Sequence, residues 1–337
     1  MRALVVCRDN IGDTLLTTPL ISALYQEGGY RVDVLANSYN AGVLARNPDI
    51  GTVYIYQKIH HRGAGESRLG ILLRRLKIMW QIRRTRYDIA VIAKSRWDRR
   101  VLKWGTLSGA ARILALGERS HPAITDLVTP PEGSREHLVQ RFHRMLSPLG
   151  LRSPAGPLVL SADPHAVAAL AGRYGIVPGE PVIGLQISAR RILQRWPEAS
   201  FIALAGLIAA AGPGRIILLW SPGAADNPTH PGDDELAARI VAACRLPVLV
   251  PIATASLDEL TAAMQLCDSV VTSDGGAMHI AAGLGKGIVA LFGDSDPVCW
   301  APWQVPHTVL QGEDNNVASI SPRRVYQALR ELDSHER

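Results

Sequence analysis

Short apolar runs rich in β-branched residues alternate with longer amphipathic stretches along almost all of this 337-residue chain. This alternation is typical of parallel strands, because two parallel neighbours need a crossover long enough to hold a helix. The sequence therefore predicts an α/β protein built from doubly wound parallel sheets. Ten strands are expected, at residues 3–7, 31–36, 52–56, 88–93, 112–116, 181–187, 215–220, 247–250, 269–272 and 287–292.

A stretch dense in Pro and Gly, residues 147–163, separates two halves of similar size. We predict a first domain at residues 1–155 and a second at 156–337, each large enough for its own core and facing the other across a cleft. Open parallel sheets bind ligands beyond the carboxyl ends of their strands. The loops that follow the predicted strands are therefore the places to search for chemistry.

The two halves differ in charge. Residues 1–150 carry 23 Lys and Arg against 12 Asp and Glu, and the remainder carries 13 against 18. An anionic partner would therefore meet the first half. Nucleic acid is disfavoured, because aromatic residues make up only 5% of the chain and no binding motif accompanies the basic residues.

The four cysteines lie far apart with no CxxC pair, so we expect neither a disulfide framework nor a cysteine zinc site. This use of cysteine indicates a reducing compartment. The apolar run at residues 3–7 is shorter than a signal-peptide core of about 7–15 residues. We expect a cytoplasmic protein. The most membrane-like stretch, residues 201–220, is broken at residues 212–215 and predicts a helix, a turn and a strand instead of a span.

The loop after the first strand, residues 7–13 (CRDNIGD), precedes a helix expected to start near Thr14. Gly12 would permit a tight turn, and Asp13 would lie at or beside the helix N-cap. This carboxylate could cap the helix or act chemically at the edge of the sheet, and both interpretations stay open. The loop lacks GxGxxG, so no Rossmann dinucleotide fingerprint is present.

A second loop, residues 270–279 (VVTSDGGAMH), has the pattern of a strand, a glycine turn and a helix start. Free N–H groups beside small residues would cradle a phosphate or diphosphate. In the alternative interpretation Asp274 caps the helix and His279 is a core residue. A Walker A loop is excluded, because Lys286 lacks the required glycine before it and the Ser or Thr after it.

Two more charged loops follow strands of the second half. Residues 188–197 carry Arg190, Arg191 and Arg195, which suit either a phosphorylated substrate or a solvated surface. Residues 294–296 form an Asp-x-Asp pair similar to the metal signature of some nucleotide-sugar enzymes, but no third ligand can be placed. We therefore expect no metal site.

Residues 62–86 hold eight basic residues and one acid. The apolar residues within this segment recur at helical spacing and predict a helix that packs on the sheet with a basic outer face. Contact of the same helix with an anionic membrane surface is an additional hypothesis. These apolar residues are Leu69, Leu72, Leu73, Leu76, Met79 and Ile82.

Several of these segments together resemble glycosyltransferase family 9, the lipopolysaccharide heptosyltransferases. They are residues 4–20 (LVVCRDNIGDTLLTTPL), 195–197 (RWP), 273–282 (SDGGAMHIAA) and 290–297 (ALFGDSDP). The resemblance covers nearly the whole chain. It implies the GT-B fold of two Rossmann-like domains, with the acceptor bound mainly by the first and the nucleotide sugar mainly by the second.

The resemblance also implies an inverting, metal-independent transfer, typically of heptose from ADP-heptose to a lipopolysaccharide core or related anionic glycan at the inner face of the inner membrane. No cofactor is needed beyond the nucleotide sugar. Asp13 would be the general base. The donor would be bound by Ser188, Arg191, Gln194, Arg195, Asp226, Asp274, Gly275, Gly276, Met278 and His279, and the acceptor by Arg8, Asn10 and Gly12.

This chain departs from the family pattern where members usually carry a lysine two residues before the tryptophan of the Trp-Pro pair. It has Gln194 there, so Arg191 or Arg195 would supply the charge toward the phosphates. Two rival hypotheses share the expected fold. One is a nucleotide-sugar epimerase, which needs no acceptor, and the other is a non-catalytic protein that binds a nucleotide or an anionic lipid.

Overall fold

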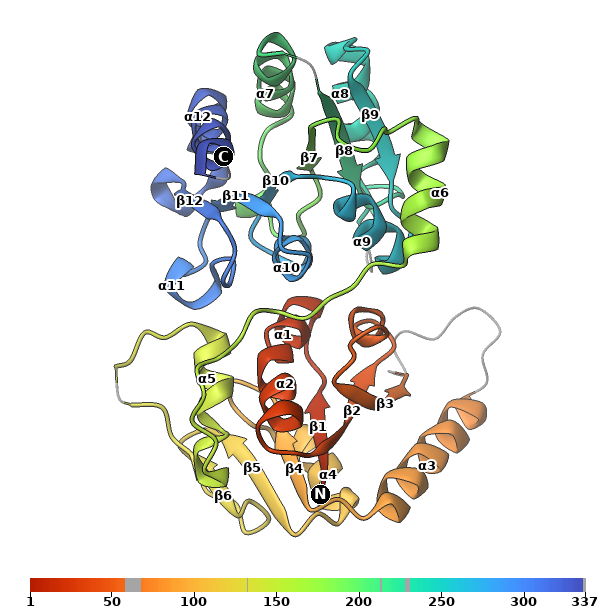
Figure 1. Cartoon of the computed structure of the whole chain (residues 1–337), viewed down its shortest axis with the longest axis vertical. Coiled ribbons are helices and arrows are strands. Elements are labelled where there is room, and N and C mark those ends of the chain that lie inside the picture. The colour runs from red at the N-terminus through yellow and green to blue at the C-terminus, as the bar shows by residue number, and fades with distance from the viewer. Residues whose placement is uncertain (58–67, 132, 213, 228–230, 336–337) are drawn as a thin grey trace. The chain divides into compact units, whose positions relative to one another are not determined.

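The computed structural model describes residues 1–57, 68–131, 133–212, 214–227 and 231–335. The chain forms two compact units, Met1–Leu160 and Ser161–Arg337, called unit 1 and unit 2 below (Figure 1). The division falls inside the Pro- and Gly-rich stretch, at residue 160 where the sequence predicts 155.

Unit 1 contains a parallel six-stranded sheet in the order β3-β2-β1-β4-β5-β6. Its strands are β1 (Arg2–Cys7), β2 (Arg31–Asn37), β3 (Ile50–Tyr56), β4 (Ile89–Ile92), β5 (Arg112–Leu116) and β6 (Asp126–Val128). Its helices are α1 (Ile11–Leu15), α2 (Thr18–Gln26), α3 (Arg68–Thr85), α4 (Arg99–Ser108) and α5 (Leu138–Arg144), with short 3₁₀ turns at η1 (Ala41–Leu44) and η3 (Ser147–Leu149).

Unit 2 contains a second parallel six-stranded sheet, in the order β12-β11-β10-β7-β8-β9. Its strands are β7 (Val182–Gln186), β8 (Arg215–Trp220), β9 (Leu249–Ala253), β10 (Ser269–Ser273), β11 (Gly287–Phe292) and β12 (His307–Gln311). Its helices are α6 (Pro164–Tyr174), α7 (Glu198–Ala210), α8 (Asp234–Cys244), α9 (Leu257–Gln265), α10 (Gly276–Gly283), α11 (Pro297–Trp300) and α12 (Pro322–His335), and its 3₁₀ turns are η4 (Ile192–Gln194), η5 (Glu313–Asn315) and η6 (Val317–Ser319).

The two sheets share one topology. Read from β9 to β12, the strand order of unit 2 is the same as that of unit 1 read from β3 to β6. It is the doubly wound order, in which the first and fourth strands of each unit are central neighbours. The chain turns back at this pair, so the loops after β1 and β4, and those after β7 and β10, leave in opposite directions and open a crevice. Each unit therefore has its ligand-binding position at the carboxyl ends of its central strands.

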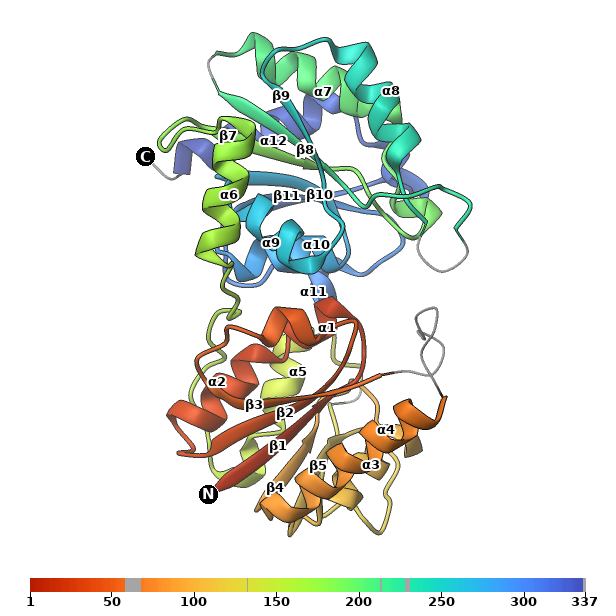
Figure 2. The same cartoon turned by 90° about the vertical axis from the view of Figure 1, so that its right-hand side faces the viewer.

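Helices cover both faces of each sheet (Figure 2). In unit 1 the inward residues of one face, such as Leu4 and Val6 of β1, pack with Ile82 of α3 and Val101 of α4. The helices α1, α2 and α5 lie on the other face. Both faces of a parallel sheet are buried in this way, which explains why the central strands β1 and β4 are largely apolar.

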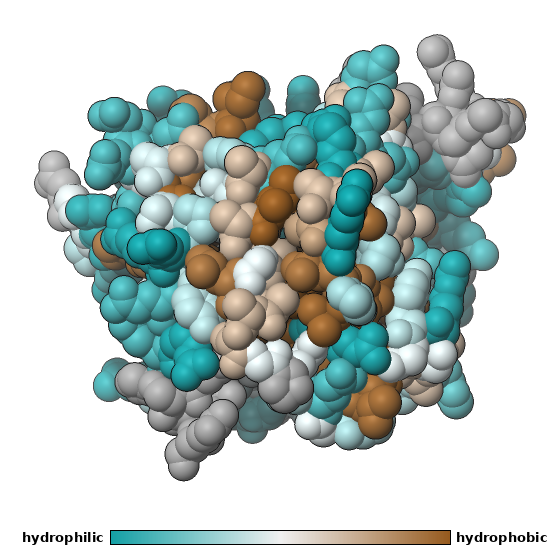
Figure 3. Space-filling model, turned by 90° about the horizontal axis from the view of Figure 1, so that it is seen from above, coloured by the Kyte–Doolittle hydropathy of each residue, from teal (hydrophilic) through white to brown (hydrophobic). Residues whose placement is uncertain are grey.

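In unit 2, α7, α8 and α12 cover one face, and α6, α9 and α10 cover the other (Figure 2). The helix α7 is apolar on more than one side. Phe201 and Leu204 are buried in the core, whereas Ile202, Leu207 and Ile208 are partly exposed. Figure 3 shows the molecule from above the view of Figure 1, with apolar side chains, in brown, gathered in the middle of the surface seen there.

All ten predicted strands are confirmed, with ends that shift by at most a few residues. Residues 201–220 form α7, a turn and β8, as predicted. The sequence missed β6 and β12, one outer strand of each sheet, because their apolar runs are short. All four cysteines are free thiols.

The prediction for the basic helix was wrong in part. Met79 and Ile82 pack against the core of unit 1, but Leu69, Leu72, Leu73 and Leu76 are exposed at 64%, 52%, 57% and 49%. The beginning of the predicted segment, at residues 62–67, lies outside the described residues. No helix in the described part of the chain is both long enough and apolar enough to cross a bilayer.

Candidate active site

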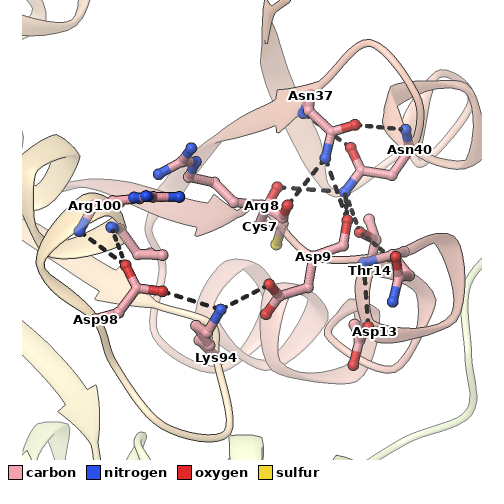
Figure 4. A network of polar contacts seen from close by, with 12 residues as sticks. Cys7, Arg8, Asp9, Asp13, Thr14, Asn37, Asn40, Lys94, Asp98 and Arg100 are labelled. Atoms are coloured by element: carbon pink, nitrogen blue, oxygen red, sulfur yellow. Dashed lines mark hydrogen bonds and ion pairs between the residues drawn. The ribbon is translucent and has the colours of Figure 1, made fainter. Parts of the chain in front are cut away.

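The candidate site of unit 1 lies at the carboxyl ends of β1 and β4, which are neighbours in the sheet (Figure 4). Lys94, just beyond β4, donates to Asp9 Oδ1 in the loop after β1, with an Nζ–O distance of 2.9 Å. The same ammonium lies 3.1 Å from Asp98 Oδ2. Asp98 in turn caps α4 by accepting from the backbone N–H groups of Arg100 and Val101. One lysine thus joins two loops at the edge of the sheet.

The helix after β1 starts earlier than expected. It begins at Ile11, not near Thr14, with Asn10 at the N-cap and Asp13 in the first turn. The Asn10 backbone N–H donates to Asp13 Oδ2 at 3.1 Å. Gly12 lies inside this helix and forms no tight turn, which corrects the prediction for that residue. Asp13 therefore contributes to capping from the third helical position, where a carboxylate also favours the positive end of the helix dipole.

Capping does not account for the electrostatics of Asp13. Burial, and next the charge of Asp9, raise the pKa of Asp13 from 3.8 to about 6, although the hydrogen bond from Asn10 and the charge of Lys94 act in the opposite direction. A carboxyl group with this pKa is mostly ionised at pH 7 and still accepts a proton readily. That combination is what a general base requires.

Two buried asparagines hold the loop after β1 in place (Figure 4). Asn37 Nδ2 donates to the carbonyl oxygens of Arg8 and Asp9, at 3.1 and 3.2 Å. Asn40 Nδ2 donates to the carbonyl of Asp9 at 3.1 Å and to Thr14 Oγ1 at 2.6 Å. These bonds satisfy backbone groups that no strand or helix partner reaches, so they fix the path of the chain between β1 and α1.

The residues expected to bind an acceptor differ in accessibility. Arg8 is partly exposed, and its Nε donates to the Tyr56 hydroxyl at 2.5 Å while its guanidinium stacks 4.9 Å from the Tyr56 ring. Asn10 is exposed, whereas Gly12 is buried. Arg75 of α3 approaches the same ring at 6.0 Å. Arg8 and Arg75 therefore form a basic pair at the ring of Tyr56, and Arg8 belongs to the loop that leads into the helix carrying Asp13.

In unit 2 the corresponding position lies after β7 and β10, which are again neighbours. Gly275 and Gly276 start α10, and a side chain on Gly275 would enter open space. The space beside Gly275 is therefore open, and the unpaired N–H groups at such a helix start suit a phosphate. The prediction of a strand, a glycine turn and a helix start is confirmed.

Asp274, directly before this helix start, is held by side chains from two other loops. Gln194 Nε2 donates to Asp274 Oδ2 at 3.1 Å and to Ser295 Oγ at 2.9 Å, and the Ser295 hydroxyl donates to the same carboxylate. Burial raises the pKa of Asp274 above its ordinary value, while the hydrogen bond from Ser295 and the charge of Arg191 counteract this rise. Gln194 is only 6% exposed, so its amide positions Asp274 within the protein.

The charge missing at Gln194 is present nearby. Arg191 is exposed and forms an ion pair with Asp294 in the loop after β11. The carboxylate of Asp296 caps α11 by accepting from the Val298 N–H at 3.0 Å. Among the described residues no three His, Cys, Asp or Glu side chains form a cluster that could hold a metal ion.

The remaining predicted donor residues lie in different surroundings. Ser188 accepts from the Ser221 backbone N–H at 2.9 Å. Arg195 lies 3.7 Å from the buried carboxylate of Asp233 and lines a hollow of about 300 Å³ with Glu198 and Arg239. Asp226 is exposed in the loop after β8.

Met278 and His279 belong to the first turn of α10 and are buried, at 0% and 2% exposure. In this structure their side chains pack within unit 2, and the His279 ring lies 6.4 Å from the ring of Trp300. A bound donor would meet the backbone of α10 before it met either side chain.

Sequence reasoning missed four residues that organise these sites: Asn37, Asn40, Lys94 and Ser295. Lys94 follows β4, Asn37 ends β2 and Asn40 follows β2, so their position at a strand end was an available signal. What the sequence does not reveal is which strands are neighbours, and therefore which loops meet.

Comparisons with known proteins agree with this architecture. The model of glycosyltransferase family 9 (heptosyltransferase) matches residues 75–328. Lipopolysaccharide heptosyltransferase 3 of Escherichia coli is 26% identical over 306 residues, covering 87% of this chain and 83% of that protein.

Two solved structures share the fold. A family 9 glycosyltransferase from Veillonella parvula aligns with a TM-score of 0.83 at 20% identity, covering 99% of this chain and 97% of that one. The E. coli heptosyltransferase WaaC, solved with ADP, aligns with a TM-score of 0.77 at 20% identity, covering 98% and 100%. The fold is GT-B, as the resemblance implies. The epimerase hypothesis is not supported by these matches, and the chain belongs to glycosyltransferase family 9, the heptosyltransferases.

Proposed function

We propose that this glycosyltransferase transfers heptose from ADP-heptose, with inversion and without a metal ion, to a lipopolysaccharide core or a related anionic glycan. The observation that carries the proposal is Asp13, a carboxylate whose pKa is raised to about 6 at the central switch point of the unit 1 sheet. The similarity of the chain to lipopolysaccharide heptosyltransferases supports the proposed classes of sugar donor and acceptor.

In the proposed reaction Asp13 removes the proton from the acceptor hydroxyl. The oxygen attacks the anomeric carbon of the sugar as the bond from that carbon to the diphosphate oxygen breaks, and a single displacement of this kind inverts the configuration. Lys94 lowers the proton affinity of Asp13 and balances the charge of Asp9. The basic pair Arg8 and Arg75 would bind anionic groups of the acceptor.

The departing ADP would be stabilised by the N–H groups at the start of α10 and by Arg191. A helix N-terminus carries about half a positive charge and presents unpaired donors, so it favours the diphosphate without a metal ion. Asp274 would act through position, because it holds Gln194 and Ser295 beside this helix start. Of the Asp-x-Asp pair, one carboxylate is used in an ion pair and the other as a helix cap.

The donor assignment is tested by calorimetric titration with ADP, UDP, GDP and CMP, each with and without magnesium. We expect selective, magnesium-independent ADP binding that Asp274→Ala abolishes. Preference for another nucleotide would retain the fold and family but reject ADP-heptose. Saturable ADP binding without turnover on any donor and acceptor would favour the non-catalytic hypothesis.

We further propose that the enzyme works at the cytoplasmic face of the inner membrane, because its proposed acceptor is anchored in lipid. The excess of basic residues in the first 150 positions supports this, since the acceptor would bind to that part of the chain. Binding of a phosphorylated acceptor should weaken with salt more than binding of ADP, as measured by titration at 0.05 and 0.5 M salt. Equal salt dependence would refute the charge argument.

A further inference from the structure

The surface helix α3 has two apolar stripes, of which one packs on the core of unit 1 and the other is exposed. Ile71 and Ile82 are buried, at 1% and 0% exposure, and Ile78 and Met79 pack against the core of unit 1. Figures 1 and 2 show α3 on the outside of this unit, with one long side turned away from the sheet. The helix is therefore anchored by one stripe and presents the other outward.

The outward stripe is continuous. Its five members follow the i, i+3, i+4, i+7, i+11 spacing of a single helix face, and each is about half or more exposed. A monomeric protein rarely exposes a row of large apolar side chains to water. The members are Leu69, Leu72, Leu73, Leu76 and Trp80.

The charges on α3 indicate the kind of partner. The helix contains six Lys and Arg and no Asp or Glu. Lys77 and Arg84 fall beside the apolar stripe in the helical projection and are exposed, and the Arg84 guanidinium lies 5.1 Å over the ring of Trp80. An exposed tryptophan beside leucines and cations is typical of a helix that lies in the boundary between lipid headgroups and acyl chains.

We infer that α3 docks unit 1 on an anionic lipid bilayer, with the five apolar residues inserted and the basic residues on the headgroups. A second copy of the chain fits this face less well, because two such helices would bring their positive charges together. A phospholipid surface supplies both the hydrocarbon and the negative charge.

The same helix reaches the candidate acceptor site. Arg75 Nη2 donates to the Gln57 carbonyl at 2.8 Å, and its guanidinium lies 6.0 Å from the Tyr56 ring on which Arg8 also stacks. Docking through α3 would therefore hold the loop that contains Arg8, and the start of α1 that carries Asp13, close to the membrane surface. This step rests on the proposed function, which supplies a lipid-anchored acceptor, whereas binding to a bilayer needs no turnover.

The test is flotation of the full chain with vesicles of phosphatidylcholine alone and of phosphatidylcholine with 30 mol% phosphatidylglycerol, a composition of about one-third anionic lipid. We expect binding to the anionic vesicles. Leu72→Ser with Leu76→Ser should reduce the partition coefficient by about tenfold or more, because both side chains lose their transfer into the bilayer. The matched control is Val177→Ser, which changes a residue of unit 2 that is 60% exposed and outside the stripe.

The charge component is tested separately. Lys77→Gln with Arg84→Gln should weaken binding to anionic vesicles by about tenfold and leave the weak binding to neutral vesicles unchanged. The control with the same change in charge is Arg323→Gln with Arg324→Gln, which alters two exposed residues of α12 in unit 2. If the leucine variant and the charge variant of α3 both bound anionic vesicles as strongly as the wild type, the proposal would be overturned.

Further outcomes separate this proposal from neighbouring ones. Leu69→Ser with Leu73→Ser is a second variant of the same stripe, and thermal melting shows whether each variant folds. If the leucine variants convert a dimer of the chain into a monomer, the face is a protein interface and the proposal fails. Transfer to a water-soluble, deacylated acceptor should be unchanged in the leucine variants. Vesicle binding by α3 without any transfer would retain this surface and reject the proposed function.

Discussion

Replacement of Asp13 by Asn separates a capping role from a catalytic one. Asn keeps an oxygen that can accept the Asn10 N–H bond, so the start of α1 should remain intact. It cannot take a proton from an acceptor hydroxyl. We therefore expect kcat to fall by about 10²–10⁴-fold, the usual contribution of a general base.

The same variant should be more stable than the wild type at neutral pH. The pKa of Asp13 rises from 3.8 to about 6 on folding. The native state therefore binds the proton more tightly than the unfolded state, and stability is lost as the pH rises through about 6. Roughly two pKa units at 1.36 kcal/mol each correspond to about 3 kcal/mol, and partial exposure of Asp13 reduces this to about 1–3 kcal/mol.

The assay is urea unfolding of both proteins at pH 7.5 and pH 4. Asp13→Asn should be about 1–3 kcal/mol more stable at pH 7.5 and close to the wild type at pH 4, where the native carboxyl is already protonated. In wild-type transfer assays kcat/KM should fall about tenfold per pH unit below about 6. The control is Glu118→Gln, which removes an exposed carboxylate of unit 1. A full transfer rate in Asp13→Asn, or the same stability difference at both pH values, would refute this reasoning.

Three other changes probe the supports of the two sites. Lys94→Met removes a cation that lowers the pKa of Asp13, so the acidic limb of the kcat/KM profile should move to higher pH. The control Lys103→Met, at an exposed position of α4, should leave this limb in place. Asn40→Ala removes the buried donor to Thr14 Oγ1 and one of the two side-chain donors to the Asp9 carbonyl, so it should lower the free energy of unfolding by about 1–3 kcal/mol in urea titrations. An unchanged midpoint would contradict the bracing role. Gly293→Ala would place a methyl group 2.4 Å from a backbone carbonyl oxygen of the loop after β7. Calorimetry should then show weaker ADP binding, and thermal melting should show a less stable protein. Wild-type values in both measurements would show that the two loops need not approach closely.

The sequence predicted most strands of the fold because the central strands are buried and largely apolar. Both faces of these parallel sheets are covered by helices, so the strands stand out as short β-branched runs. The outer strands β6 and β12 were missed because their apolar runs are short. The apolar face of α3 was predicted to pack on the sheet, but four of its leucines are exposed. Periodicity reveals an apolar helix face, but it does not reveal whether the protein itself covers that face.

For the site, the sequence by itself determined that Asp13 follows the first strand and that two glycines follow β10, since loop residues after strands are local features. It could not decide between capping and chemistry for Asp13, because the pKa depends on burial and on Asp9 in a folded loop.

Only the tertiary structure made β1 a neighbour of β4, and β7 a neighbour of β10. That pairing brings Lys94 to Asp9 across 85 residues and Gln194 to Asp274 across 80. Strand order is set by how whole βαβ units pack, which involves many residues distant in sequence, so no local pattern encodes it.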